Sequence, residues 1–281
     1  MRHECYFCHT KTVENLIDKF QPGAGIAEKL VRSVNSCIRM NWNEANPVIA
    51  TGIHRLARDI LNRQELYKEE KHKANELLLG MYDVWSGMVA ESEDPLFTAA
   101  KLAVIGNVLD YGAHSIESDI ISQINTLSDN DLAKDESGEL FKRIGSAGSI
   151  LYLGDNAGEI VFDRLFIETS GHSNVTYVVR GEPVINDVTM EDAQQCGMDK
   201  VCRVISNGYD APSTLPPYCS DEFTEQYNTA DLIIAKGQGN LEGLMNSDHE
   251  NLFFLLMAKC KPIAELVGVH VGDMVVYSSN R

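Results

Sequence analysis

Two oxygen-bearing side chains lie in a glycine-rich turn that joins an apolar run to an amphipathic one. The segment LYLGDNAGEIVFD covers residues 151–163, with Asp155 and Asn156 between Gly154 and Gly158. A glycine-rich turn between a strand and a helix commonly cradles a phosphate with its backbone N–H groups. Because an aspartate repels an anion, this turn could instead hold the cation that an anion needs.

A second acidic side chain and two cations follow other apolar runs. Arg180 follows VTYVV, Asp187 lies in PVINDVT (183–189), and Lys236 opens KGQGN (236–240). Ligands of open α/β sheets bind beyond the carboxyl ends of the strands. We therefore expect these side chains to lie near the first glycine-rich turn.

The oxygen-bearing side chains Asp155, Asn156 and Asp187 are hard ligands, with no sulfur or imidazole near them in the sequence. Such a set suits Mg²⁺ or Mn²⁺ better than zinc or copper. The same residue types are also common helix N-caps. A metal site and a set of helix caps therefore both remain open at this point.

The charge of the chain bears on its partners. The net charge is −17, and residues 146–281 contain eight basic and 19 acidic residues, for −11. This balance argues against nucleic acid as a partner. Arg180 and Lys236, two of the five basic residues between 150 and 258, each directly follow an apolar run and precede a glycine. With a divalent metal, such cations resemble the equipment of phosphoryl transfer, in which the metal neutralises phosphate oxygens and orients or activates a water.

The first part of the chain has helical periodicity. Apolar residues at 3.6 spacing predict a helix over 25–40, and Asn46-Pro47 begins another that runs to residue 62. Further helices are expected over 68–91 and from Pro95 to Gly112. We therefore predict a helical N-terminal domain over residues 1–146.

After Gly148 the pattern changes to short apolar runs separated by polar helical segments. Continuous apolar strands that alternate with helices indicate a mostly parallel sheet covered on both faces. We predict a three-layer α/β, Rossmann-like domain over 147–281, and a proline-containing loop at 209–221 that could cover the site. The expected strands are SILYL (149–153), VTYVV (175–179), VCRVI (201–205), DLIIA (231–235), FFLLM (253–257) and MVVYS (274–278).

Targeting and cysteine signals are weak. Residues 1–15 lack the apolar core of a signal peptide, and the apolar stretch 251–259 is too short to span a bilayer, so we expect a soluble, cytoplasmic protein without membrane contact.

The seven cysteines are odd in number and widely spaced, which is typical of reduced thiols rather than of a disulfide framework. Cys5 and Cys8 have CxxC spacing, but no second pair accompanies them, so zinc is weakly supported.

Other nucleotide-binding classes are less well supported. There is no GxxxxGK[ST] segment, and GQGNLEG (237–243) is not a GxGxxG dinucleotide motif. GDNAGE (154–159) loosely resembles the first turn of S-adenosylmethionine-dependent methyltransferases, so that class remains an alternative. A non-catalytic metal- or metabolite-binding protein is a second one.

Taken in order, the motifs resemble one family: the metal-dependent damage-control phosphatases, long catalogued as a domain of unknown function and related to acidic-residue methyltransferase-like proteins. The prokaryotic branch begins with CxxC, followed by GNxxD, GDNAGE, PVINDVT and KGQGN. Here CxxC is Cys5 to Cys8, and GNxxD is Gly106-Asn107-Val-Leu-Asp110. The resemblance extends over essentially the whole chain, and several motifs in one order are more specific than any one of them.

The resemblance implies a divalent-metal-dependent phosphatase that hydrolyses small phosphate monoesters, often sugar phosphates or metabolic side-products. It assigns the metal, which is Mn, Mg, Ni or Co in the family, to Asp155, Asn156 and Asp187. It assigns the substrate phosphate to Lys236 and to the turn that contains Gly237, Gly239 and Asn240.

Further residues are expected around this pocket. Asn107 and Asp110 are three apart near a helix end, hence on one helix face, and could complete the pocket from the helical side. Arg180 is expected to bind anionic substrate, and Glu159 to support the first turn or to act as a first-turn helix charge. The attacking group is a water or Asp155 itself, which would form an aspartyl-phosphate.

Overall fold

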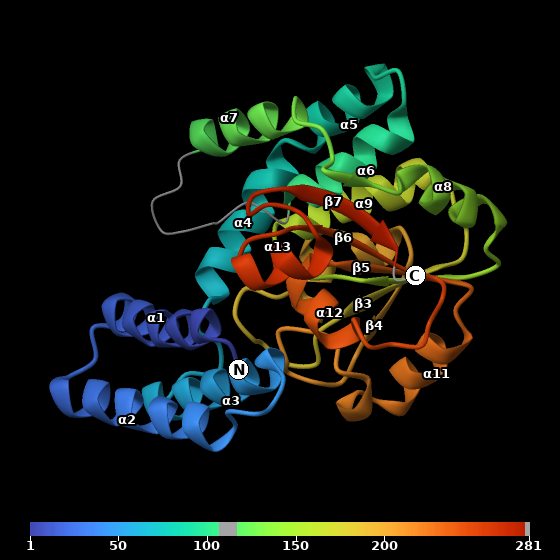
Figure 1. Ribbon diagram of the computed structural model, residues 1–281. Coiled ribbons are helices and arrows are strands. Elements are labelled where there is room, and N and C mark those ends of the chain that lie inside the picture. The colour runs from blue at the N-terminus through green and yellow to red at the C-terminus, as the bar shows by residue number, and fades with distance from the viewer. Residues whose placement is uncertain (107–116, 279–281) are drawn as a thin grey trace.

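A single sheet with helices on both faces organises the computed structural model (Figure 1), which describes residues 1–106 and 117–278. Within these residues the sheet has seven strands in the order β1-β7-β6-β5-β2-β3-β4. Neighbouring strands are parallel except for the antiparallel pair β6–β7. The predicted α/β fold with a mostly parallel sheet is therefore confirmed. The strands are β1 (Lys134–Asp135), β2 (Ile150–Leu153), β3 (Val175–Val179), β4 (Arg203–Ser206), β5 (Leu232–Lys236), β6 (Leu252–Met257) and β7 (Met274–Ser278).

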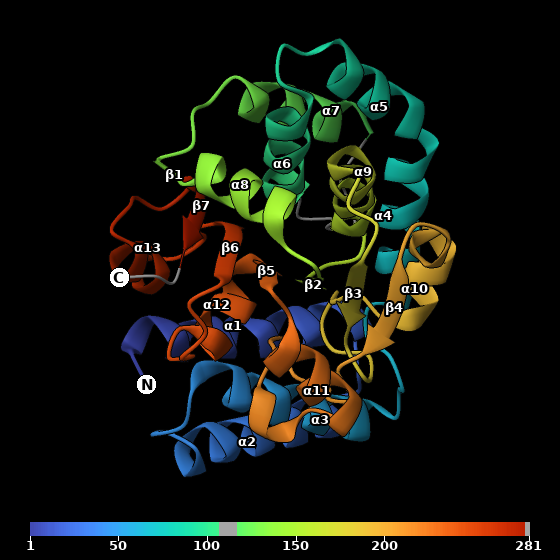
Figure 2. The same ribbon diagram turned by 90° about the vertical axis from the view of Figure 1, so that its right-hand side faces the viewer.

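The inner strands are buried on both faces, as their unbroken apolar sequences predict. Successive side chains point to opposite faces, so Tyr152 of β2 faces one layer of helices while Leu151 and Leu153 face the other. Figure 2 shows the two layers on either side of the strands. The first layer contains α6 (Pro95–Gly106), α7 (Glu117–Ser128), α8 (Ser137–Ser146), α9 (Glu159–Ser170) and α10 (Met190–Gln195), and the second contains α11 (Asp221–Thr229), α12 (Gly237–Leu244) and α13 (Lys261–Val267).

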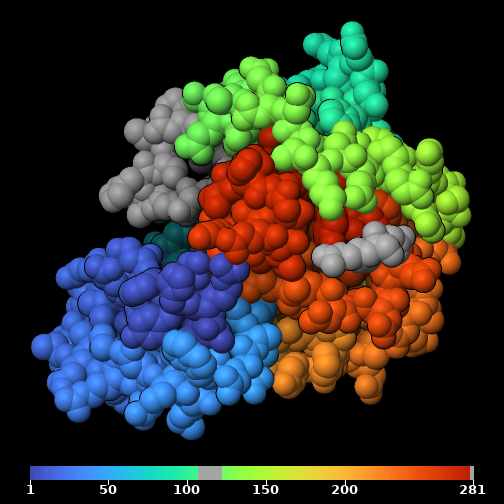
Figure 3. Space-filling view, viewed as in Figure 1, coloured from blue at the N-terminus to red at the C-terminus, as the bar shows by residue number. Residues whose placement is uncertain are grey.

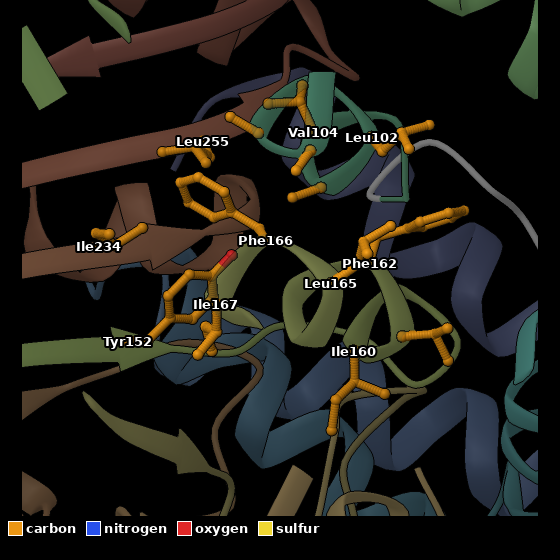
Figure 4. Packing of buried hydrophobic residues seen from close by; sticks show 14 of the residues in the cluster. Leu102, Val104, Tyr152, Ile160, Phe162, Leu165, Phe166, Ile167, Ile234 and Leu255 are labelled. Atoms are coloured by element: carbon orange, nitrogen blue, oxygen red, sulfur yellow. The ribbon is translucent and has the colours of Figure 1, made fainter. Parts of the chain in front are cut away.

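The main core lies between the sheet and the pair α6–α9. In Figure 4, Phe166 of α9 points toward the strands, whereas Phe162 lies on the side of the same helix away from them. Trp85 packs edge-on against Phe162, with ring centroids 5.6 Å apart. This packing fixes the start of α9, and with it the glycine-rich turn that precedes the helix.

The first three helices have a core of their own. They are α1 (His3–Phe20), α2 (Ala24–Met40) and α3 (Asn46–Leu61), and they bury a separate apolar cluster around Leu16, Leu30 and Ile53. Figure 3 shows them gathered to one side of the molecule.

The helix predicted over 68–91 is wrong in one respect, because the chain breaks it at Met81. The two pieces are α4 (Lys68–Gly80) and α5 (Tyr82–Glu91). The break allows α4 to contact α9 and α10 while Trp85 of α5 enters the main core.

The helices before residue 147 divide between two cores. Helices α5 to α8 share the main core with the sheet, and β1 forms the edge of that sheet beside β7. The predicted domain boundary at residues 146/147 stays a prediction. No helix among residues 1–106 and 117–278 is both long and apolar enough to cross a membrane.

Candidate active site

The turn after β2 and the segment PVINDVT are joined through their backbones. Asn156 and Asp187 form an isolated antiparallel bridge. On either side of it, the Ala157 amide donates to the Asn186 carbonyl at 2.9 Å and the Val188 amide donates to the Asp155 carbonyl at 2.8 Å. The three predicted metal ligands are thereby brought together from two segments about thirty residues apart in sequence.

Arg180, at the end of β3, lies between the two aspartates. Its Nε donates to Asp187 Oδ2 at 2.7 Å, and its Nη2 lies 3.4 Å from Asp155 Oδ1. The arginine is buried. It therefore compensates part of the negative charge that the two carboxylates bring into the protein interior.

Asn240 of α12 connects this group to the second glycine-rich turn. Its Nδ2 donates to the carbonyls of Gly154 at 3.2 Å and Lys236 at 2.8 Å, and its Oδ1 accepts from Arg180 Nη1 at 3.2 Å. The ends of β2 and β5 are thus held side by side, at the point where the strand order reverses and open α/β sheets bind their ligands.

The two predicted glycines of the second turn, Gly237 and Gly239, are required for different structural reasons. Gly237 has φ +76°, a conformation that side chains disfavour. Gly239 has no such φ, but a Cβ there would lie 2.3 Å from the carbonyl oxygen of Pro212. The turn therefore packs directly on the backbone of the loop that follows β4.

Lys236 lies beneath the first turn, where its ammonium contacts two carboxylates. Nζ lies 2.5 Å from Glu159 Oε1 and 2.6 Å from Asp163 Oδ1, and it donates to the carbonyl of Ala103 at 2.7 Å. Glu159 also accepts from the backbone and side-chain nitrogens of Asn156, at 3.2 and 3.0 Å. The lysine is therefore linked to the candidate metal ligands through Glu159.

Asp163 belongs to this network although its place in the sequence did not predict it. It accepts hydrogen bonds from the hydroxyls of Tyr152 at 2.8 Å and Tyr177 at 2.9 Å, in addition to the bond from Lys236. Its position one helical turn after Glu159 was visible in the sequence. The two tyrosines that bring their hydroxyls to it were not, because only the pairing of β2 with β3 places them side by side.

The buried charges of the cluster do not balance. The four carboxylates of Asp155, Glu159, Asp163 and Asp187 face the two cations of Arg180 and Lys236, which leaves two excess negative charges among these described residues when all six groups are ionised.

The pKa values reflect this excess. Burial, with Asp187 and Glu159 nearby, raises the pKa of Asp155 to about 8. Burial also raises the pKa of Asp187, against the effect of Arg180. A divalent cation carries the charge that this cluster lacks.

The donor atoms also suit such an ion. Asn156 turns its Nδ2 toward Asp155 Oδ2, at 2.9 Å, and toward Glu159, so its amide oxygen is the atom left for a cation. Among the described residues no group of three or more His, Cys, Asp and Glu side chains is arranged to hold a metal. The candidate set differs from such a group because it combines two aspartates with an asparagine.

The loop predicted over 209–221 packs against the site. Thr214 accepts from Arg180 Nη1 at 3.3 Å, and Asp210 forms ion pairs with Arg55 and with Arg58, at 2.7 Å for the latter. Arg58 also donates to the carbonyl of Pro183, in the segment that contains Asp187. Helix α3 thus holds two of the loops that build the site.

Two further pairs of residues were singled out in the sequence. Asn107 and Asp110 are outside the described residues, but α6 ends at Gly106, whose Cβ position would be 3.2 Å from Glu159. Cys5 and Cys8 lie on α1, where burial raises the pKa of both thiols.

Comparison with known proteins identifies the family. Residues 1–275 match the model of the damage-control phosphatase ARMT1-like domain. The chain belongs to the damage-control phosphatase family. The predicted family and its phosphatase class are thus confirmed.

Two of three similar relatives carry the family name. A damage-control phosphatase of Archaeoglobus fulgidus is 37% identical over 82% of this chain and 81% of its own. One of Pyrococcus horikoshii is 32% identical over 98% and 96%, and an uncharacterized protein of Methanocaldococcus jannaschii is 35% identical over 98% and 94%. The crystal structure of a domain-of-unknown-function family protein from Pyrococcus horikoshii superimposes with a TM-score of 0.90 at 29% identity, covering 100% of this chain and 99% of that one.

Proposed function

We propose that this member of the damage-control phosphatase family is a divalent-metal-dependent hydrolase of small phosphate monoesters, with sugar phosphates and side-product phosphates of metabolism as the substrate class. The observation that carries the proposal is the backbone pairing of Asn156 with Asp187 inside a buried cluster with two excess negative charges. Asp155, Asn156 and Asp187 would hold the ion, which would be Mn²⁺, Mg²⁺, Ni²⁺ or Co²⁺. When bound, the ion supplies positive charge to the phosphate oxygens.

The phosphate is proposed to bind at the turn Gly237 to Asn240. The N–H groups at the start of a helix lack intrahelical acceptors and favour anions. The cations Arg180 and Lys236 would reduce the repulsion between this acidic site and an anion, since each lies beside two of its carboxylates. Asn107 and Asp110, beyond the end of α6, are proposed to contact the substrate from the opposite side.

The reaction is proposed to be direct attack by water on phosphorus. The bond from phosphorus to the ester oxygen breaks, and the alcohol leaves with a proton. Direct attack is favoured over an aspartyl-phosphate because the Asp155 carboxylate is assigned to the metal ion, with Arg180 3.4 Å from its Oδ1. Acid quenching with radiolabelled substrate separates the two routes, because attack by Asp155 would leave label on the protein.

The decisive experiment measures phosphate release from a panel of phosphate esters with each of the four metals. We expect turnover that EDTA removes and that Asp155→Asn and Asp187→Asn reduce to background, while Asp199→Asn, an exposed aspartate, retains it. A metal at 100 times its Kd should also raise the free energy of unfolding by about 2.7 kcal/mol. Metal-dependent stabilisation without any phosphate release would overturn the catalytic proposal in favour of a binding protein.

A further inference from the structure

Helix α4 contacts both segments that carry the candidate metal ligands. The turn with Asp155 and Asn156 leads into α9, and the segment with Asp187 leads into α10. Helix α4 packs against both of these helices. Its sequence, KEEKHKANELLLG, has the charged character of a solvent-facing helix, but its side of Lys71, Asn75 and Leu78 is buried.

Asn75 forms hydrogen bonds to both segments at once. Its Oδ1 accepts from the backbone amide of Gly158 at 2.6 Å. Its Nδ2 donates to Asp192 Oδ1 at 3.0 Å and to Gln195 Oε1 at 2.8 Å. Asn75 has no exposed surface, so a group deprived of its bond here would have no water to replace it.

Asp192 connects Asn75 to the segment that contains Asp187. Its Oδ2 accepts from the amide and hydroxyl of Thr189, at 2.8 and 2.7 Å, which closes the capping box of α10. Lys71 Nζ lies 2.8 Å from the same oxygen and 2.9 Å from Glu65. These bonds hold the carboxylate in one orientation and connect it to Thr189, two residues beyond Asp187 of the bridge between the ligand segments.

We infer that Asn75 is a positioning residue for the metal ligands: by binding Gly158 and Asp192 together, it fixes the separation between the turn of Asp155 and Asn156 and the segment of Asp187. Gly158 follows Asn156 by two residues, and Thr189 follows Asp187 by two. The two segments are thus connected twice, by the backbone bridge between Asn156 and Asp187 and by the Asn75 side chain. The inference rests on the proposed function, because it takes the ligand assignment from it.

The test exchanges the hydrogen-bonding roles of Asn75 and Asp192. Asn75→Asp places two carboxylates against each other and loses the donor to Asp192. Asp192→Asn alone places two amides there. The double variant restores the pair between positions 75 and 192 at the same size and total charge, although not the bond to Gln195: the new carboxylate at 75 accepts from Gly158, and the new amide at 192 donates to it.

The probe is Mn²⁺ and the first readout is its Kd by calorimetry. Groups that orient metal ligands typically change affinity about 10- to 100-fold when they are lost. We expect Asn75→Asp to weaken Mn²⁺ binding by about that factor and the double variant to recover most of it. Hydrogen exchange of the peptide around Gly158, in protein without metal, should rise in the single variant and fall again in the double variant. Asn35→Asp, the same change at an exposed position of α2, is the control and should keep the wild-type Kd.

The outcomes separate the inference from the proposed function. If wild-type protein binds no divalent metal and releases no phosphate, the proposed function fails. If wild-type protein does both and Asn75→Asp binds Mn²⁺ as tightly, the inference is overturned. If Asn75→Asp does not fold, the double variant decides: near wild-type Mn²⁺ affinity supports the inference, and a folded double variant that binds weakly contradicts it.

Discussion

At the scale of single residues, we expect substitution of Arg180 to destabilise the protein strongly, because its guanidinium is buried between two carboxylates. Arg180→Met should lower the free energy of unfolding by about 3–5 kcal/mol in EDTA, as expected when one partner of a buried ion pair is removed. Chemical denaturation measures this. Arg203→Met is the matched control: this arginine pairs with Glu222 at the surface, where such pairs contribute at most about 1 kcal/mol. Equal losses in both variants would contradict a special role for Arg180.

His54 gives the fold a dependence on pH that is separate from the site. Burial lowers its pKa to about 4, against about 6.5 in an unfolded chain. Between these values the unfolded state binds the additional proton, so the free energy of unfolding falls as the pH falls from about 6.5 to 4, by at most about 3 kcal/mol.

The variant His54→Leu should therefore lose less stability than the wild-type protein over this pH interval. Urea denaturation at several pH values measures the difference, with the exposed His270→Leu as the control that should parallel the wild type. Identical pH slopes for His54→Leu and wild type would show that His54 does not titrate in this way.

Some residues of the site could be predicted from their type and sequence position, and others could be found only from the structure. Asp155, Asn156 and Asp187 were predictable because carboxylate and amide oxygens followed apolar runs that read as strands. Asn75 was not, because it lies in a charged helix and becomes buried only through partners more than eighty residues away. No local pattern records such pairing.

At the scale of elements, the second glycine-rich turn packs so closely on the loop after β4 that a side chain at Gly239 should destabilise the protein. In Gly239→Ala the new Cβ would clash with the Pro212 carbonyl oxygen. Because this is a backbone atom, it can move away only if the loop moves. We expect a loss of about 1–3 kcal/mol in unfolding free energy and a loss of phosphatase activity, because the loop also contacts Arg180.

The matched control for this change is Gly145→Ala in α8. A Cβ there meets nothing within 4 Å, and alanine favours helices over glycine by about 1 kcal/mol. Denaturation and activity should both remain at or above wild-type values. If Gly239→Ala behaved like Gly145→Ala, the turn and the loop would not be packed as described.

Elements were predictable where a run was long and apolar, and less so where it was short or polar. The six predicted strands all occur, displaced by no more than two residues at either end. The edge strand β1 was not predicted, because Lys134 and Asp135 have no strand-like pattern and become a strand only by pairing with β7. The break at Met81 was also missed, since helical periodicity continues across it and only packing separates α4 from α5.

At the scale of the whole molecule, a net charge of −17 opposes the approach of an anionic substrate. Salt shortens the range of this repulsion, from a Debye length of about 30 Å at 0.01 M to about 8 Å at 0.15 M ionic strength. At saturating metal, kcat/KM for a phosphate monoester should therefore rise over this interval, by about twofold or more. Because kcat excludes association, it should change less. A fall in kcat/KM with salt would mean that local cations dominate the approach.

The position of β7 has a consequence for how the protein is made. β7 lies between β6 and β1, although it is the last of the seven described strands in sequence, and in the described residues β1 joins the sheet through Val275 and Val276. During synthesis β6 and β1 thus have no strand between them until the residues of β7 have left the ribosome. Until then the nascent protein must keep two unpaired strand edges away from other chains. A product that ends before Met274 would lack an interior strand of the sheet, and we expect it to aggregate or to be degraded by quality control.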